Sequence, residues 1–232
     1  MAQAKIVRLH KIVGLVFGIQ LVFWTLSGLF FTLFPIEQVR GENLRIEIDH
    51  GELDMAAANI STLHKYSDLD ARPDAAELKM FLGTPVWKLS GEEGTHLIDA
   101  QTGETLSPIS KQSALEIATL GMSGKAGTPG EPWLIEGNAP REYTGPLPVW
   151  AVDFEPGTVR AYIDGQTGEL RTVRTRLWRT FDALWRFHIM DVTGANRIDS
   201  WWLKIAAFFG LTLALSGLVL GIDALRKGRA FK

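Results

Sequence analysis

Two long stretches without a charged side chain constrain the fold of this chain more than any other feature. The first, 12–34, reads IVGLVFGIQLVFWTLSGLFFTLF, and the second, 205–222, reads IAAFFGLTLALSGLVLGI. At about 1.5 Å per residue, a helix over the first stretch is long enough to cross the roughly 30 Å hydrocarbon layer of a bilayer. Trp201 and Trp202 extend the second stretch where an aromatic belt is expected. The sequence therefore predicts transmembrane helices over 12–34 and 201–223.

The flanks of these stretches predict the orientation of the chain. Basic residues lie before the first stretch and after the second, at Lys5, Arg8, Lys11, Arg226, Lys227, Arg229 and Lys232. The positive-inside bias then places 1–11 and 224–232 in the cytoplasm and 35–200 outside, which in a bacterium means an inner-membrane protein with a periplasmic domain. The alternative for 12–34 is a cleaved signal peptide, but the stretch is too long for one and no small-residue cleavage pattern follows.

Composition excludes several kinds of function. The chain has 24 basic and 26 acidic residues among 232 and a formal net charge of −2, which gives no reason to expect a nucleic-acid partner. It has no cysteine, which excludes disulfides, covalent haem attachment, thiolate iron–sulfur clusters and a cysteine nucleophile. HExxH, GxSxG, P-loop and dinucleotide motifs are also missing from the sequence.

An internal repeat predicts the organisation of the segment between the apolar stretches. PVWKLSGEEGTHLIDAQTGETL (85–106) aligns with PVWAVDFEPGTVRAYIDGQTGELRTV (148–173), and each reads as a three-stranded antiparallel meander with a tight DxQTGE turn. Helices are expected over 54–69 and 109–121, the latter capped by Ser110 and stopped by Gly121. A stretch rich in Gly and Pro, 121–148, predicts a long loop. The fold class is therefore α+β, with units over 35–108 and 109–173 that each combine a helix and a meander.

A further helix is expected between the second unit and the second apolar stretch, within 174–200. Leu177, Phe181, Leu184, Trp185 and His188 share one face of that helix. Arg179, Asp182 and Arg186 lie on the opposite face at spacings that allow pairing. Such a helix would lie on the outer membrane surface before the chain turns at DVTGAN. His188 then falls on the buried face, where an imidazole needs iron, a carboxylate, a backbone carbonyl or a lipid headgroup as its partner.

The same residues resemble a known family. The SALEIA helix and the meander ending in YIDGQTGEL resemble the PepSY domain, and RLHKIVGLVFGIQLVFWTLSGLFF resembles the PepSY-associated transmembrane family. The resemblance covers essentially the whole chain and is strongest at 1–34 and 146–222. Larger members include inner-membrane reductases that carry b-type haem and serve ferric-siderophore uptake, whereas isolated PepSY domains act as binding or inhibitory modules. The resemblance implies either a redox component of iron uptake or a non-enzymatic binding module.

Five histidines are the candidate ligands for a metal or haem. His10 lies at the cytoplasmic end of the first stretch, followed by Gly14 and Gly18, and the second stretch has small residues at Ala206, Gly210, Ala214, Gly217 and Gly221. These stripes allow either a porphyrin to lie against a helix or two helices to pack through small residues. His10 is then either a haem ligand or an interfacial residue. We interpret His50, His64 and His96 as ordinary residues, in a turn, a helix and just before a strand.

The predicted topology places His10 and His188 on opposite sides of the membrane, so the two imidazoles cannot ligate one iron. A symmetric dimer that pairs His10 with His10 and His188 with His188 would hold two haems. The sequence thus predicts a redox component with haem b bound at these two histidines, as a homodimer or with a partner membrane protein. The alternative is a membrane-anchored periplasmic module that regulates a partner.

Overall fold

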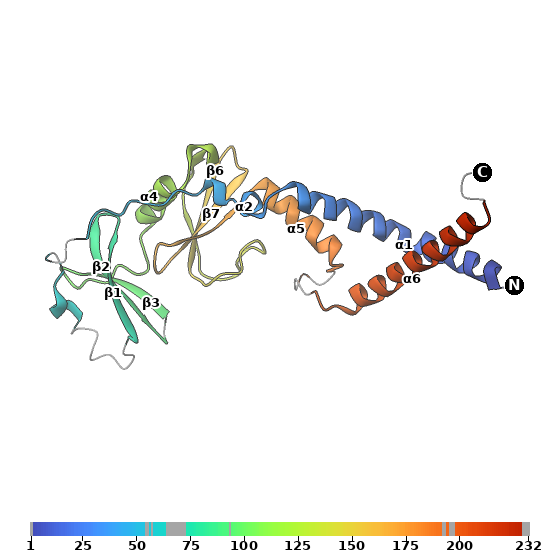
Figure 1. Cartoon of the computed structure of the whole chain (residues 1–232). Helices are drawn as coiled ribbons and strands as arrows, with labels where there is room; N and C mark the ends of the chain where they lie inside the picture. The colour runs from blue at the N-terminus through green and yellow to red at the C-terminus, as the bar shows by residue number, and fades with distance from the viewer. Residues whose placement is uncertain are drawn as a thin grey trace. The chain divides into compact units, whose positions relative to one another are not determined.

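The computed structural model describes most of the chain as two compact units (Figure 1). It describes residues 2–53, 56, 58–63, 73–92, 94–191, 194 and 198–228. One unit consists of Met1–Ile36 and Thr180–Lys232, and the other of Glu37–Arg179. The helical ends of the chain thus come together in one unit, while the segment between them forms the other.

The first unit is helical. Its long helices are α1 (Ala2–Leu33) and α6 (Trp201–Arg226), and the last turns of α5 (Arg176–His188) belong to it. Ser200 caps α6 by accepting a hydrogen bond from the N–H of Leu203 at 3.3 Å. Among the described residues, α6 has the length and apolarity that a membrane span requires, whereas the apolar segment found in α1, Phe17–Leu33, is shorter.

The two long helices pack on each other through small and aromatic residues. The rings of Phe17 and Phe209 stack with centroids 4.6 Å apart. A Cβ added to Gly14 would lie 3.5 Å from Leu213, and one added to Gly210 would lie 3.4 Å from the ring of Trp24. Part of the predicted small-residue stripe therefore serves helix packing, as such residues do when two backbones approach closely.

The second unit contains two antiparallel sheets. The meander predicted over 148–173 is present. The one predicted over 85–106 is only partly right, because its third strand lies before the repeat, at 75–81, and the segment after the DAQTGE turn makes only an isolated bridge between Thr105 and Ile98. The first sheet has the order β1-β2-β3, and the second has β4-β6-β7-β8, with β5 also paired to β6. The strands of the first sheet are β1 (Ala75–Phe81), β2 (Thr84–Gly91) and β3 (Gly94–Asp99). Those of the second are β4 (Thr128–Pro129), β5 (Trp133–Ile135), β6 (Val149–Glu155), β7 (Val159–Asp164) and β8 (Leu170–Arg174). The short elements are α2 (Ile36–Val39), η1 (Glu42–Leu44), η3 (Ile60–Leu63) and η4 (Gly124–Ala126).

The DxQTGE turns of the two repeats have the same geometry. Asp99 Oδ1 accepts from the backbone N–H groups of Gln101 and Thr102, each at 2.8 Å. In the second repeat Asp164 Oδ1 accepts from Gln166 and Thr167, again at 2.8 Å. This is the local bonding that makes aspartate a turn residue, as the repeat predicts.

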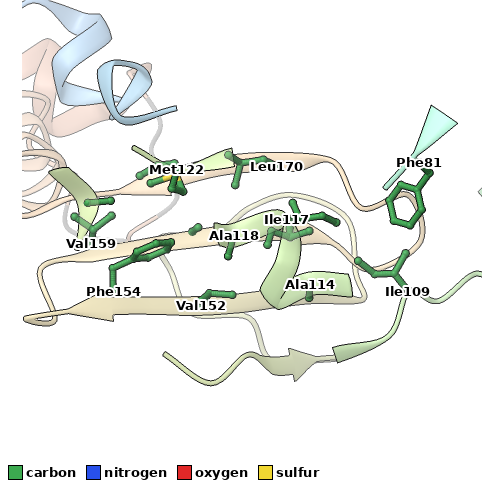
Figure 2. Packing of buried hydrophobic residues seen from close by; sticks show 14 of the residues in the cluster. Phe81, Ile109, Ala114, Ile117, Ala118, Met122, Val152, Phe154, Val159 and Leu170 are labelled. Carbon is green, nitrogen blue, oxygen red and sulfur yellow. The ribbon is translucent and has the colours of Figure 1, made fainter. Parts of the chain in front are cut away.

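Helix α4 (Lys111–Gly121) is the predicted helix of the second repeat, with the predicted cap. Ser110 Oγ accepts from the N–H of Ser113 at 3.0 Å, and the helix ends at Gly121. Its buried face, with Ile117 and Ala118, packs against the second sheet (Figure 2). The same cluster contains Val86 and Leu97 of the first repeat, so residues of both repeats share one core.

The helix predicted over 54–69 is not found in its described part. Ile60–Leu63 form a 3₁₀ helix, and Ala58 and Asn59 are irregular. Asn59 donates its N–H to Ala100 O at 2.9 Å and bonds the N–H of Ser61 through its side chain at 3.0 Å. These bonds favour a turn over an α-helix, because they occupy the groups that a helix would use. Residues 64–69 lie outside the described residues.

Candidate functional site

His188 lies at the end of α5, where its ring meets a buried serine of α1. Its Nδ1 is 2.7 Å from the hydroxyl of Ser27, whose residue is 3% exposed. The same hydroxyl lies 2.6 Å from Phe23 O, which can only accept. Because a hydroxyl has one hydrogen, it donates to that carbonyl and accepts from the imidazole. Nδ1 therefore carries a hydrogen, and in the neutral ring Nε2 keeps its lone pair.

Aromatic side chains surround this imidazole. The ring of Phe31 lies 5.5 Å from that of His188, and the ring of Trp185 lies 6.2 Å away and nearly parallel. Trp24 lies at 6.2 Å and donates its indole N–H to His188 O at 2.6 Å. The predicted apolar face of α5 is therefore packed on α1, where Phe181 also lies 4.7 Å from Phe31.

His10 makes the corresponding contact at the other end of the helix pair. Its Nδ1 is 2.8 Å from the hydroxyl of Ser216 on α6, and that hydroxyl donates to Leu213 O at 2.9 Å. The hydroxyl of Ser216 likewise gives its one hydrogen to Leu213 O, so Nδ1 of His10 is the donor, and in the neutral ring Nε2 keeps its lone pair. A Cβ on Gly217 would lie 3.2 Å from Cε1 of His10, so the small residue next to Ser216 makes room for the ring.

The two histidine–serine pairs are alike in chemistry and far apart. Ser27 follows His10 by about 17 residues of continuous helix, which at about 1.5 Å per residue separates them by about 26 Å. The two imidazoles therefore cannot ligate one iron atom. Each still has the form of a metal-binding histidine, since such residues donate one ring N–H to an oxygen and bind with the other nitrogen. On donor chemistry, both residues fit the axial ligand of a haem.

Some small residues of the two long helices contact the other helix, and others face open space. Gly14, Gly210 and Gly217 lie against side chains of the partner helix. Gly18 and Gly221 have no heavy atom within 4 Å of an added Cβ. The stripe on α1 thus packs at Gly14 and is open at Gly18.

The remaining histidines have ordinary surroundings where they are described. His50 accepts the N–H of Leu82 on Nδ1 at 3.2 Å and stacks on Phe81, in an irregular segment where a turn was predicted. Burial and the charge of Lys79 lower the pKa of His50. His96 is exposed within β3, and His64 lies outside the described residues. Within the described ranges, no three His, Asp or Glu side chains converge as a metal site would require.

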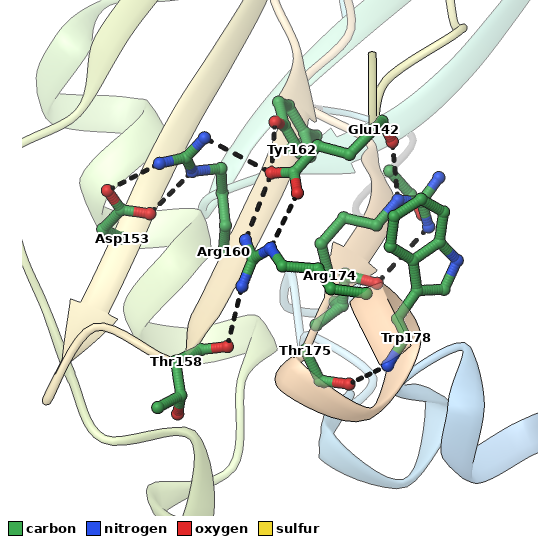
Figure 3. Close-up of polar contacts among 11 residues, drawn as sticks. Glu142, Asp153, Thr158, Arg160, Tyr162, Arg174, Thr175 and Trp178 are labelled. Carbon is green, nitrogen blue, oxygen red and sulfur yellow. Dashed lines mark hydrogen bonds and ion pairs between the residues drawn. The ribbon is translucent and has the colours of Figure 1, made fainter. Parts of the chain in front are cut away.

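A partly buried ion cluster around Glu142 was not predicted from the sequence (Figure 3). Its carboxylate accepts two hydrogen bonds from Arg179, at 2.9 and 3.2 Å, and one from Arg160 at 3.3 Å. The hydroxyl of Tyr162 donates to it at 2.9 Å. Arg160 also makes two bonds to Asp153, at 2.7 and 3.0 Å. Arg179 was predicted to pair along its own helix, and its partner Glu142 instead comes from the predicted loop 121–148.

The contacts of the cluster determine the protonation states of Glu142 and Tyr162. Burial alone raises the pKa of Glu142, but the hydrogen bonds from Arg179 and Tyr162 and the charges of Arg179 and Arg160 outweigh it and hold that pKa below its ordinary value. Burial raises the pKa of Tyr162 to about 12. Near neutral pH, Glu142 is therefore charged and Tyr162 is neutral, which suits the ion pairs and the hydrogen bond that the two groups make.

The comparisons with known proteins do not place this chain in a family. No protein-family model matches it, and no curated protein and no solved structure gives a significant match. The likeness to the PepSY family therefore rests on the quoted motifs.

Proposed function

We propose that the chain is a bacterial inner-membrane protein that binds haem b through His10 and His188 and takes part in transmembrane electron transfer or ferric-siderophore iron uptake. The observation that carries the proposal is the pair of His–Ser contacts, which in the neutral imidazoles leaves Nε2 with a lone pair. A bound haem would supply one-electron transfer at iron. The proposal follows the resemblance of the motifs to PepSY-type proteins.

The surfaces of the two long helices support the membrane part of the proposal. On α1, Leu15 is 81% exposed and Ile19 is 67% exposed, and on α6 Phe208 is 65% exposed. Apolar surface of this extent needs a cover, and lipid is the cover that the length of α6 fits. We propose that α1 spans the membrane beside α6, that both termini are cytoplasmic and that residues 35–200 are periplasmic.

The surroundings of His188 suit a ligand held in place. Ser27 fixes the ring by its contact with Nδ1, and the rings of Phe31 and Trp185 limit the access of water. His10 and His188 would each hold one haem, together with a residue of another copy of the chain or of a partner membrane protein.

Visible absorption of the full chain, purified in detergent after haem-replete expression, tests the proposal. We expect a Soret band, and loss of about half of the haem in each of His10→Ala and His188→Ala if each site holds one group. The control is His96→Ala, which removes an exposed histidine of β3 and should leave the spectrum unchanged. A chain without a Soret band, or a band unchanged in the double variant, would reject haem binding.

The second candidate is a membrane-anchored binding module without a cofactor. The observation that favours it is a groove of ≈ 620 Å³ on the second unit, lined by the irregular segment 47–51, Leu53 and residues 78–80 of β1. A photoreactive side chain at Leu53 should then crosslink to one membrane partner in the native host, whereas one at His96 should not. Equal crosslinking at both positions, or none, would reject the binding module.

A further inference from the structure

Strand β1 is an edge strand of the first sheet, where it pairs with β2 alone. The register places Met80 opposite Pro85. Pro85 turns its C=O away from β1, because that oxygen accepts the N–H of Ala100 at 2.9 Å. The backbone groups of two opposite residues in an antiparallel pair either both face inward or both face outward. Met80 therefore directs its N–H and C=O away from β2.

The same direction recurs at every second residue of the strand. Leu78 and Ala76 therefore also present their N–H and C=O groups at the outer edge of β1. Within the part of the chain that the structure describes, no hydrogen bond reaches these outward groups of Ala76, Leu78 or Met80. An edge of this kind is a template on which an extended chain can add as a further strand.

The groove of ≈ 620 Å³ described above lies at this edge. Residues 78–80 form one wall, and the irregular segment 47–51 forms another. His50 holds this segment beside the β1–β2 turn, since its Nδ1 accepts the N–H of Leu82 at 3.2 Å. Ala76, near the other end of the strand, is exposed. The edge is thus accessible at one end and borders a positioned wall at the other.

Two carboxylates make this wall acidic. Glu47 and Asp49 both line the groove, and Asp49 accepts the N–H of Gly51 at 2.9 Å. Neither carboxylate makes an ion pair with another described residue, and Glu52, which follows the segment 47–51, makes none either. These negative charges are available to cations of a bound molecule.

The lining of the groove also includes one lysine, Lys79. It is half-buried, and the charges that act on it are those of Lys88, Glu77 and Glu169. With Lys79 itself, this group has two charges of each sign, so it adds no net charge to the groove. Glu47 and Asp49 therefore leave the groove acidic.

We propose that β1 binds an extended, basic segment of a partner protein, which adds to the first sheet as a strand beyond β1 and places its cations against the segment 47–51. The unpaired backbone groups recognise the extended conformation, and the carboxylates select the charge. A second copy of the chain suits the edge less well, because its own β1 edge borders the same acidic segment. This inference rests on the second candidate function, the binding module, and names its partner; the haem proposal does not depend on it.

Calorimetric titration of the full chain, in a neutral detergent at about 0.15 M ionic strength, tests the proposal with two synthetic peptides. The probe is acetyl-(Val-Lys)3-Val-amide, which is basic and favours an extended strand. The control is acetyl-(Pro-Lys)3-Pro-amide, which has the same charge but lacks every second backbone N–H and cannot pair along a strand. We expect the probe to bind at least about tenfold more tightly than the control, because several backbone hydrogen bonds are at stake.

Variants of the chain separate the two parts of the recognition. Ala76→Pro removes one outward N–H and keeps the pairing of β1 with β2, so it should raise Kd by about fivefold or more. The matched control is Ala76→Val, which keeps that N–H and should leave Kd within about twofold. Glu47→Gln/Asp49→Asn should raise Kd by about threefold or more, whereas Glu92→Gln, at the exposed β2–β3 turn, should not change it.

Several outcomes would overturn the proposal. Equal affinity for the two peptides, or equal Kd values for Ala76→Pro and Ala76→Val, would exclude strand addition at β1. An unchanged Kd in Glu47→Gln/Asp49→Asn would exclude selection by charge. Self-association of the chain that Ala76→Pro abolishes, without binding of the probe, would assign the edge to a second copy instead. The two peptides still test the unaltered chain if Ala76→Pro fails to fold.

The failure of this inference is distinguishable from the failure of the binding module itself. If the full chain does not bind the probe while Leu53 still crosslinks to one membrane partner, strand addition is wrong and the binding module stands. If the probe binds with the expected variant effects, the proposed edge and its preference for basic segments are supported. Neither result alters the expected Soret band, because β1 and the segment 47–51 contain neither His10 nor His188.

Discussion

Replacing Glu142 by glutamine removes the negative charge that lies between Arg160 and Arg179. The side chain of Glu142 is 13% exposed, and those of its two partners are 25% and 38% exposed. Removing one member of a buried ion pair costs about 3–5 kcal/mol. Here Arg160 keeps Asp153, Arg179 is partly hydrated, and glutamine keeps one acceptor oxygen. We therefore expect a loss of about 2–3 kcal/mol in the free energy of unfolding of the second unit.

The loss should be visible as a shift in thermal unfolding. For a domain of this size, we expect the Tm from near-UV circular dichroism to fall by about 8 °C at pH 7. The control is Glu136→Gln, which makes the same change on an exposed residue of the same loop and should leave Tm within about 1 °C.

The pH dependence gives a second, independent check. The folded pKa of Glu142 lies below the ordinary value of 4.5, so its contribution is complete above that value and is lost as the pH falls through the folded pKa. The difference between wild type and Glu142→Gln should therefore shrink at about pH 3.5 relative to pH 7. An unchanged Tm at pH 7 would refute the assigned role of the ion cluster, and a difference that stays constant with pH would refute the linkage.

Two further predictions each compare the same substitution at two positions that differ in one interaction. Gly168→Ala combines a positive φ of +70° with a Cβ 2.5 Å from the ring of Phe81, and should lower the free energy of unfolding in urea by about 3 kcal/mol. Gly83→Ala, with φ +79° and open space around the added Cβ, should lower it by about 1 kcal/mol. Similar losses for the two would show that close packing at the second turn is unimportant. Asp164→Asn keeps the turn but loses the ion pair with Arg171, and should lower the free energy of unfolding by about 2 kcal/mol at pH 7. Asp99→Asn changes the corresponding turn of the first repeat, and should lower it by about 0.5 kcal/mol or less. Equal effects of the two Asp→Asn changes would contradict this reasoning.

Local rules were enough to predict the second meander, the turn of each repeat and the helix between the repeats. The Asp of each DxQTGE turn bonds the next backbone N–H groups, and Ser110 caps α4, because these interactions span only a few residues. The helix predicted over 54–69 is wrong because the structure of that segment depends on a contact with a distant residue. There, Asn59 forms its turn partly through a bond to Ala100, a partner that the sequence of the segment does not reveal.

The partners of the candidate site come from distant parts of the chain, and they were not predicted. Leu-Ser-Gly occurs in both apolar stretches, at 26–28 and at 215–217. In the structure the serine of each motif binds a histidine, Ser27 with His188 and Ser216 with His10. The serine that both apolar stretches contain was the feature of the sequence from which these contacts could have been predicted. The partners of Glu142 likewise depend on how a long loop returns to the second sheet.

The contacts of His10 also set the order in which the protein can be assembled. His10 and Ser216 are separated by 206 residues, and α1 is complete long before α6 has been synthesised. At about 5–20 residues per second, the ribosome needs tens of seconds or less to make the intervening chain, which is ample time for local turns and hairpins to form. The packing of α1 on α6 therefore cannot form until α6 has been made, and the two repeats between them can fold first.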